Sequence, residues 1–243
     1  MASSFSSYEI ARSGMHVNHR GLFVTGHNIS NVNTQGYVRQ QLMIRDNISV
    51  NVGKFQVGIG ASVEQTRQIR NQFLDNIYRD ESQLLGYAEA QSKVIQDIQA
   101  IISEPFGSGL NQIMDQFFQS WHELSKEPES ISTRAMVRQR AIVLVDSINH
   151  MAEQLDKIQE DLNTEIRLII DDINDAASKI SNLNMKIAGV GGTGDMANDL
   201  IDERNNLLDK LSKLVDIDII EKNNGMVDIT LGGVLLVNGT KTN

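Results

Sequence analysis

The longest regular feature of the chain is an apolar stripe between Leu144 and Val190. Its members recur in alternating steps of three and four residues, the spacing that keeps one side of a helix against a partner helix. They are Leu144, Ile148, Met151, Leu155, Ile158, Leu162, Ile166, Ile169, Ile173, Ala176, Ile180, Leu183, Ile187 and Val190. Two four-residue steps between Ile158 and Ile166 form a stutter, which locally unwinds a left-handed supercoil. We predict one long helix of about 70 Å, with Leu155, Ile158 and Leu162 in its packing seam.

Three shorter amphipathic segments accompany this helix. Residues 68–102 repeat the helical stripe and end at a Ser-Glu-Pro sequence, which stops a helix. This stripe consists of Phe73, Ile77, Leu84, Ala88, Gln91, Ile95, Ile98 and Ile102. Residues 110–124 predict a short aromatic helix, and residues 197–215 predict a leucine-rich helix. The side chains predicted to pack these helices into a bundle are Phe117, Phe118, Trp121, Leu207, Leu208 and Leu211.

The two ends of the chain differ from this helical middle. Residues 1–30 have helical spacing, although three glycines each weaken such a helix by about 1 kcal/mol. Between residues 37 and 63 the apolar period changes to two, which is typical of two or three short strands or extended arms. The same alternation returns from Ile217 to Val237 around two glycine-containing turns, and it predicts a β-meander.

Together these patterns predict a mainly α fold: a long coiled-coil-like helical bundle, with a small β arm near the N-terminus and a β-meander at the C-terminus. We expect an N-terminal helix and turn over residues 1–36 and an extended β arm over 37–66. The helical bundle is expected over 67–215. Residues 216–243 are expected to begin a β domain that is not complete in this chain.

Composition narrows the range of functions. The chain has 22 basic and 31 acidic residues, a net charge of −9 and no cysteine. Binding to nucleic acid needs clustered Lys and Arg, so we expect no nucleic-acid partner. The absence of cysteine excludes disulfides, thiolate metal ligands and cysteine nucleophiles. No apolar run approaches the 18 residues or so of a membrane span, and the N-terminus lacks the apolar core of a cleaved signal peptide, so we expect no membrane insertion.

Candidate chemistry is equally sparse. His16, His19 and His27 can share one helix face, but no carboxylate or cysteine completes a metal-binding set. The acidic residues between 171 and 175 are typical of the solvated face of a long helix. The glycine-rich segment 189–195 follows no strand and precedes no Gly-Lys-Ser/Thr, so it does not indicate a phosphate loop. We therefore predict no catalytic residue, no cofactor and no metal, and we expect a protein that is not an enzyme.

The most specific motif follows the first helix. Its sequence is Asn-Ile-Ser-Asn-Val-Asn-Thr-Gln-Gly-Tyr over residues 28–37. Asn and Gly tolerate left-handed backbone, and Asn side chains bond to the free amides and carbonyls at a helix end. The motif therefore predicts a helix stop and a turn. We call it the signature turn, and its predicted key residues are Asn28, Asn31, Asn33, Thr34, Gly36 and Tyr37.

This motif, followed by Arg39, resembles the N-terminal signature of the bacterial flagellar axial proteins, the family of rod, hook and hook-associated proteins. Ser30 stands where Ala is usual and Gln35 where Pro is frequent, so the turn lacks the preset φ of that proline. The resemblance extends along the chain and is strongest to the hook-associated members of the family. It continues at Phe117-Phe118 and Trp121, Glu127-Pro128, Arg134, the run Asp199 to Ser212, and Leu236-Val237-Asn238-Gly239.

The resemblance implies a structural subunit that joins hook to filament as a ring at the distal end of the hook. It also implies that the N-terminal helix lies on the inner side of the assembly. The implied partners are further copies of the chain, the hook protein on one side and a second hook-associated protein toward the filament. An export chaperone is expected to act on a C-terminal part that this chain does not contain. The implied location is the extracellular flagellum, reached through the flagellar type III apparatus without a cleaved signal peptide.

Two alternatives stay open at this point. One is a rod or hook axial protein of the same family, which shares the signature turn. The other is a generic coiled-coil adaptor, for which a constant heptad without the signature turn is expected.

Overall fold

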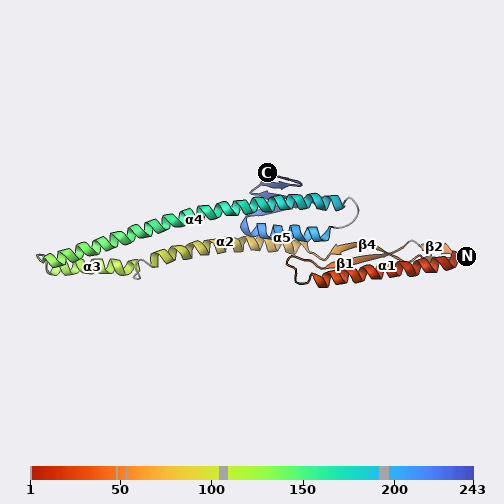
Figure 1. Ribbon diagram of the computed structural model, residues 1–243, viewed down its shortest axis with the longest axis horizontal. Helices are drawn as coiled ribbons and strands as arrows, with labels where there is room; N and C mark the ends of the chain where they lie inside the picture. Colours follow the sequence, from red (N-terminus) through yellow and green to blue (C-terminus); the bar gives the residue numbers. More distant parts are fainter. Residues whose placement is uncertain (1, 48, 53, 104–108, 192–196) are drawn as a thin grey trace. The chain divides into compact units, whose positions relative to one another are not determined.

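The computed structural model describes residues 2–47, 49–52, 54–103, 109–191 and 197–243, and it confirms a mainly helical fold with two small β regions (Figure 1). In the described part of the chain the helices are α1 (Ala2–Ser30), α2 (Gln72–Ser103), α3 (Leu110–Lys126), α4 (Ile131–Gly191) and α5 (Asn198–Leu214). The long helix predicted from the apolar stripe is α4. Most of the Ser-Glu-Pro helix stop and most of the glycine-rich segment 189–195 lie outside the described residues.

The first β region is a long hairpin with a second hairpin inside it. Strand β1 (Gln40–Asp46) pairs antiparallel with β4 (Ala61–Gln68), with Gln40 opposite Gln68. Between them, β2 (Ser49–Val52) pairs with β3 (Phe55–Gly58). The segment thus contains four strands, where the sequence predicted two or three.

The second β region is an antiparallel meander, as predicted. Its strands follow one another in the order β5 (Ile217–Glu221), β6 (Val227–Leu231), β7 (Val234–Asn238) and β8 (Lys241–Thr242). Glycines with positive φ form the turns, at Gly225 and at the Gly232-Gly233 pair. These are the turn positions that the sequence indicated.

The chain divides into two compact units. We call residues 1–84 together with 173–243 the terminal unit, and residues 85–172 the middle unit. The four-segment domain organisation predicted from the sequence stays a prediction.

In the terminal unit, α1 packs on the β1–β4 hairpin through its small and branched residues. Val17 and Val24 are buried in this contact. At Gly60, which has a φ of 101°, a side chain would overlap Ser13 on α1. The Ser13 hydroxyl accepts a hydrogen bond from the Ala61 amide at 3.3 Å. This close approach holds the hairpin against α1.

The apolar core of the terminal unit lies between α4, α5 and the meander. Its side chains are at most 4% exposed: Ile180, Leu183, Ile187, Leu208, Leu211, Val227, Ile229 and Val237. Burying each such side chain contributes about 1.5–3 kcal/mol. The two adjacent leucines of α5 differ in burial: Leu208 is buried in this core, whereas Leu207 is half-buried.

A buried amide joins the helices to the meander. Asn184 on α4 is fully buried, and its Nδ2 donates to the carbonyls of Val227 at 2.8 Å and Gly239 at 2.7 Å. Its Oδ1 accepts from the Val227 amide and from Arg204 Nη1 of α5. Arg204 also donates to the Gly225 carbonyl at 2.6 Å. We call Asn184, Arg204 and their backbone partners the polar plug. It fixes the meander turn at Gly225 to both α4 and α5.

The middle unit contains the last part of α2, all of α3 and the first part of α4. Arg140 on α4 donates to Gln116 on α3 at 2.6 Å, and Lys93 on α2 bonds Glu165 on α4 at 2.7 Å. Ile113, Val137 and Met151 are buried there.

The aromatic residues of α3 are placed differently from one another. Phe117 is half-buried, whereas Phe118 is 60% exposed and Trp121 is 50% exposed. Along α4, Ile158 and Leu162 are half-buried, and Leu155 is exposed. The packing role of these residues therefore stays a prediction, and the rings of Phe118 and Trp121 offer much of their surface to solvent.

The apolar stripe of α2 faces solvent in this structure. Phe73, Ile77 and Leu84 are exposed, while Arg79 and Ser82 on the opposite side are buried. The reason is that α2 contacts α5 through polar side chains. Arg79 bonds Asp209 at 2.8 Å and Asn205 at 3.1 Å.

Candidate functional site

The signature turn begins where α1 ends. The Asn31 amide bonds the His27 carbonyl as the last helical step, and the Thr34 and Tyr37 amides bond the carbonyls of Asn31 and Thr34. Two tight turns in succession therefore reverse the chain. Gly36 adopts a φ of 81°, the left-handed region that favours glycine.

Asn28 connects the two sides of this turn. Its Oδ1 accepts hydrogen bonds from the Tyr37 hydroxyl at 2.7 Å and from the Gln40 amide at 2.9 Å. Its Nδ2 donates to the Gln40 carbonyl at 2.9 Å. One asparagine side chain thus satisfies both backbone groups of the first residue of β1, and it pins the end of α1 to the hairpin.

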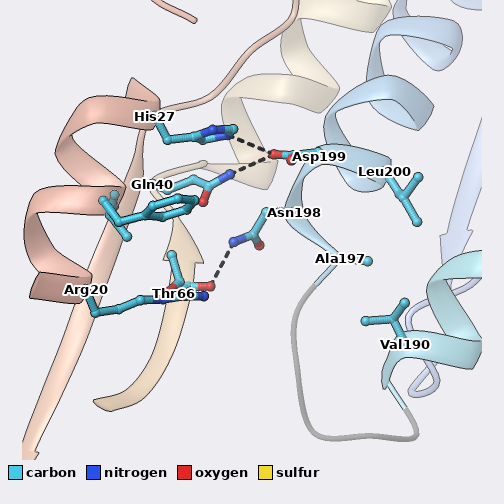
Figure 2. A pocket seen from close by; sticks show the side chains of 11 residues that line it. Arg20, His27, Gln40, Thr66, Val190, Ala197, Asn198, Asp199 and Leu200 are labelled. Carbon is cyan, nitrogen blue, oxygen red and sulfur yellow. Dashed lines mark hydrogen bonds and ion pairs between the residues drawn. The ribbon is translucent and has the colours of Figure 1, made fainter. Parts of the chain in front are cut away.

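The N-terminal half of α5 forms hydrogen bonds with the turn and with the start of β1. Asp202 Oδ2 accepts a hydrogen bond from the Val38 amide at 3.0 Å. Asp199 Oδ1 accepts from Gln40 Nε2 at 2.9 Å and lies 3.3 Å from His27 Nε2. Dashed lines mark both interactions in Figure 2. Residues three apart on a helix share a face, so Asp199 and Asp202 both point toward the turn.

Further contacts surround this carboxylate pair. A side chain at Gly36 would approach Asn206 within about 3.1 Å, so the turn lies directly against α5. Asn198 Nδ2 donates to the Thr66 carbonyl on β4 at 2.8 Å, also visible in Figure 2. We call the signature turn and its contacts with α5 the turn–helix joint.

Arg70, two residues before the start of α2, completes the joint. Arg70 pairs with Asp75, and its guanidinium also lies 3.8 Å from Asp202 and 3.9 Å from Asp209. The chain entering α2 is therefore tied to the same face of α5 as the turn.

Burial changes the acid–base behaviour of the joint. Desolvation raises the pKa of Asp202 to about 6, and the neighbouring charge of Asp199 adds to this rise. The Val38 amide and Arg70 oppose it, because both favour the ionised carboxylate. Burial, followed by the charges of Asp199 and Asp202, also raises the pKa of the Tyr37 hydroxyl.

The hollows around the joint are lined by the residues that build it. One of about 350 Å³ is bordered by His27, Tyr37, Asp202 and Asn206. Their polar groups bond to other parts of the same chain, so the arrangement organises the backbone. Over the described ranges, no cluster of three or more His, Cys, Asp or Glu side chains is suited to hold a metal ion, and no helix is long and apolar enough to cross a membrane.

The structure brings most of the predicted turn residues together. Asn28 bonds Tyr37, Asn31 bonds Thr34, and the bond from the Tyr37 amide to the Thr34 carbonyl links the two pairs. Gly36 supplies the positive φ. Asn33 is exposed at the outer side of the turn.

Sequence reasoning missed the other half of the joint. His27, Gln40 and Asn206 were not expected there, and neither were Asp199 and Asp202 of α5. The available signal was the Asp-x-x-Asp spacing within the run 199–212, which places two carboxylates on one helix face.

The fold and the joint define the class of this protein. It is a mainly helical protein with long, partly exposed helices, and hydrogen bonds hold its signature turn against α5, a helix far away in the sequence. A family model described as the flagellar hook-associated protein FlgK helical domain matches residues 95–243. The chain therefore belongs to the family of the flagellar hook-associated protein FlgK, and the resemblance to hook-associated flagellar proteins is confirmed.

Known relatives agree with this assignment. The chain is 32% identical over 232 residues to flagellar hook-associated protein 1 of Bacillus subtilis, covering 93% of this chain and 46% of that protein. It is 26% identical over 234 residues to the protein of the same name from Salmonella typhimurium, covering 95% and 42%. The chain thus spans less than half the length of these relatives.

A solved structure shares the fold. The flagellar hook junction protein FlgK from Burkholderia pseudomallei superposes with a TM-score of 0.59 at 22% identity. The match covers 71% of this chain and 30% of that one.

Proposed function

We propose that this chain acts as a structural subunit at the junction of hook and filament, assembled with further copies as a ring at the distal end of the hook. Membership of the hook-associated family supports the proposal. The observation that carries it is the turn–helix joint. A ring needs every copy to present its segments at one angle, and the joint fixes the direction in which the chain leaves α1.

The outer face of α1 offers a second support. Tyr8, Met15, Leu22 and Ile29 follow one another at seven-residue intervals, and each is 64–75% exposed. That spacing is the seam of a paired helix. We infer that a C-terminal helix of the whole protein covers this seam.

The remaining partners belong to the same proposal. They are the hook protein on one side, a second hook-associated protein toward the filament, and an export chaperone that acts on the C-terminal part. The proposed location is the extracellular flagellum, reached through the flagellar type III apparatus without a cleaved signal peptide. The role is mechanical, and it requires no catalytic residue or cofactor.

Electron microscopy of purified hook polymers tests the proposal. The purified chain, carrying a gold label, is incubated with hooks of the same species. Label confined to one end of each hook is the expected result. Label along the sides would indicate an axial protein that copolymerises with the hook. A stable dimer without affinity for hooks would indicate a coiled-coil adaptor, and either result would overturn the proposal.

A further inference from the structure

The first half of α4 carries its charge in two blocks. Residues 131–145 contain three arginines and no acidic residue. Residues 146–161 contain five acidic residues and one lysine. Within the second block, Asp146, Glu153 and Glu160 are exposed and recur every seven residues, which places them on one side of the helix. We call the two segments the basic block and the acidic block.

Exposed apolar side chains accompany the basic block. Phe118 and Trp121 on α3 leave half or more of their surface exposed. The hydrogen bond from Arg140 to Gln116 ties α3 to this part of α4. Trp, Phe and Arg are residue types enriched in the centres of protein interfaces.

Two of the three arginines of the basic block bond to neutral groups. Arg134 donates to the Pro128 carbonyl at 2.9 Å, and Arg140 donates to the Gln116 amide oxygen at 2.6 Å. Both side chains are exposed, as is that of Arg138. Their charge is therefore not neutralised by these bonds, and it is available to an acidic surface.

We propose that the basic block and the aromatic side chains of α3 dock on the acidic block of a second copy. The inference rests on the proposed function, because it assigns the lateral contact of the proposed ring. The occupant is a second copy because one helix carries both complementary charges. Two parallel copies bring them together when one is shifted by about 15 residues, or roughly 22 Å along the helix. Such a head-to-tail contact repeats from copy to copy and generates a ring or a helix.

Disulfide trapping tests this contact, because the chain contains no cysteine of its own. Ala135→Cys places a thiol in the basic block, and Asn149→Cys places one in the acidic block; both positions are exposed. Oxidation of the double variant is expected to give a ladder of dimers, trimers and longer species. A dimer alone would show an antiparallel, closed contact, and no cross-linking above that of the single variants would show no contact; both results overturn the proposal.

Charge reversal provides the matched control. Arg134→Glu with Arg138→Glu is expected to reduce ladder formation at least about tenfold, and 0.5 M salt is expected to reduce it as well by screening. Adding Asp146→Lys and Glu153→Lys to the same chain is expected to restore the ladder, because the complementarity returns with opposite sign. Failure of this restoration, with folding intact by circular dichroism, contradicts an electrostatic contact.

Hook binding separates this inference from the proposed function. Cysteine variants that label hook ends but form no ladder would overturn only the lateral contact. Variants that form the ladder but do not label hooks would overturn the junction role and leave the contact between copies in place.

Discussion

Gly36 occupies a position of the turn–helix joint that only a residue without a side chain fits. Its φ of 81° disfavours other residues by about 1–2 kcal/mol, and a Cβ there would crowd Asn206. We expect Gly36→Val to leave the helix content of the chain unchanged, because the turn is peripheral to the core, and to abolish hook-end labelling. Gly26→Ala is the matched control, since a Cβ at this helical glycine meets open space. Equal loss of helix content and of labelling in Gly36→Val would contradict this expectation.

Asp202 links the stability of the joint to pH. The pKa of this carboxyl is about 6 in the folded chain and about 3.9 when unfolded. The folded state therefore binds the extra proton, so this contribution to stability is fully present below pH 4 and is lost as the pH rises through 6. We expect the free energy of unfolding of the wild type, relative to Asp202→Asn, to fall by roughly 2–3 kcal/mol between pH 4 and pH 7. Urea titrations of both proteins check this, and parallel pH profiles would contradict it.

At the scale of elements, the polar plug around Asn184 determines how α4, α5 and the meander meet. Asn184→Ala leaves two buried carbonyls, a backbone amide and Arg204 without this partner. We expect a loss of roughly 3–5 kcal/mol in unfolding free energy, since each unsatisfied buried group costs about 1–3 kcal/mol. Asn182→Ala, an exposed position two residues earlier on the same helix, is expected to change it by less than about 0.5 kcal/mol. Similar urea midpoints for the two variants would contradict the assigned role.

The elements were largely predictable because local periodicity encodes them. The stripe from Leu144 to Val190 predicted α4, and the alternation around Gly232-Gly233 predicted the meander. The partners of the elements were less predictable. The stripe of Phe73, Ile77 and Leu84 indicates an apolar face, but not whether that face is covered in this chain. In the structure it is exposed, because the polar contacts of Arg79 select the opposite side.

The joint shows the same limit more sharply. Asn28, Asn31 and Gly36 predict a turn, because Asn and Gly tolerate left-handed backbone. Asp202 lies 164 residues beyond Val38, and a contact over that separation leaves no local pattern in one sequence. The buried carboxylate looks like an ordinary acidic residue of an amphipathic helix until the fold brings the turn to it.

At the scale of the whole molecule, α1 has one buried face and one exposed apolar face. Val24 is buried against the hairpin, whereas Leu22 is 73% exposed on the opposite seam. We expect Val24→Ser to destabilise the chain by about 2 kcal/mol, and Leu22→Ser to change stability by less than about 0.5 kcal/mol. Because we propose that the seam serves assembly, we expect Leu22→Ser to reduce the ability of the full-length protein to join hooks, although it leaves stability nearly unchanged. Unimpaired joining by that variant, measured by electron microscopy, would contradict an assembly role for the seam.

Helix α5 holds the signature turn in place through Asp202, which accepts a hydrogen bond from the Val38 amide. Hydrogen exchange of the Val38 amide, measured residue by residue in the folded chain, tests this role most directly. We predict that Asp202→Ala speeds this exchange at least about tenfold, because a hydrogen bond to a charged group contributes about 1.5–3 kcal/mol. Asp202→Asn retains an acceptor and is expected to keep most of the protection. The Gln40 amide, which bonds Asn28, serves as the internal reference and should stay protected in both. Unchanged exchange at Val38 in Asp202→Ala would show that the turn keeps its structure without this contact to α5, and it would contradict the role assigned to Asp202.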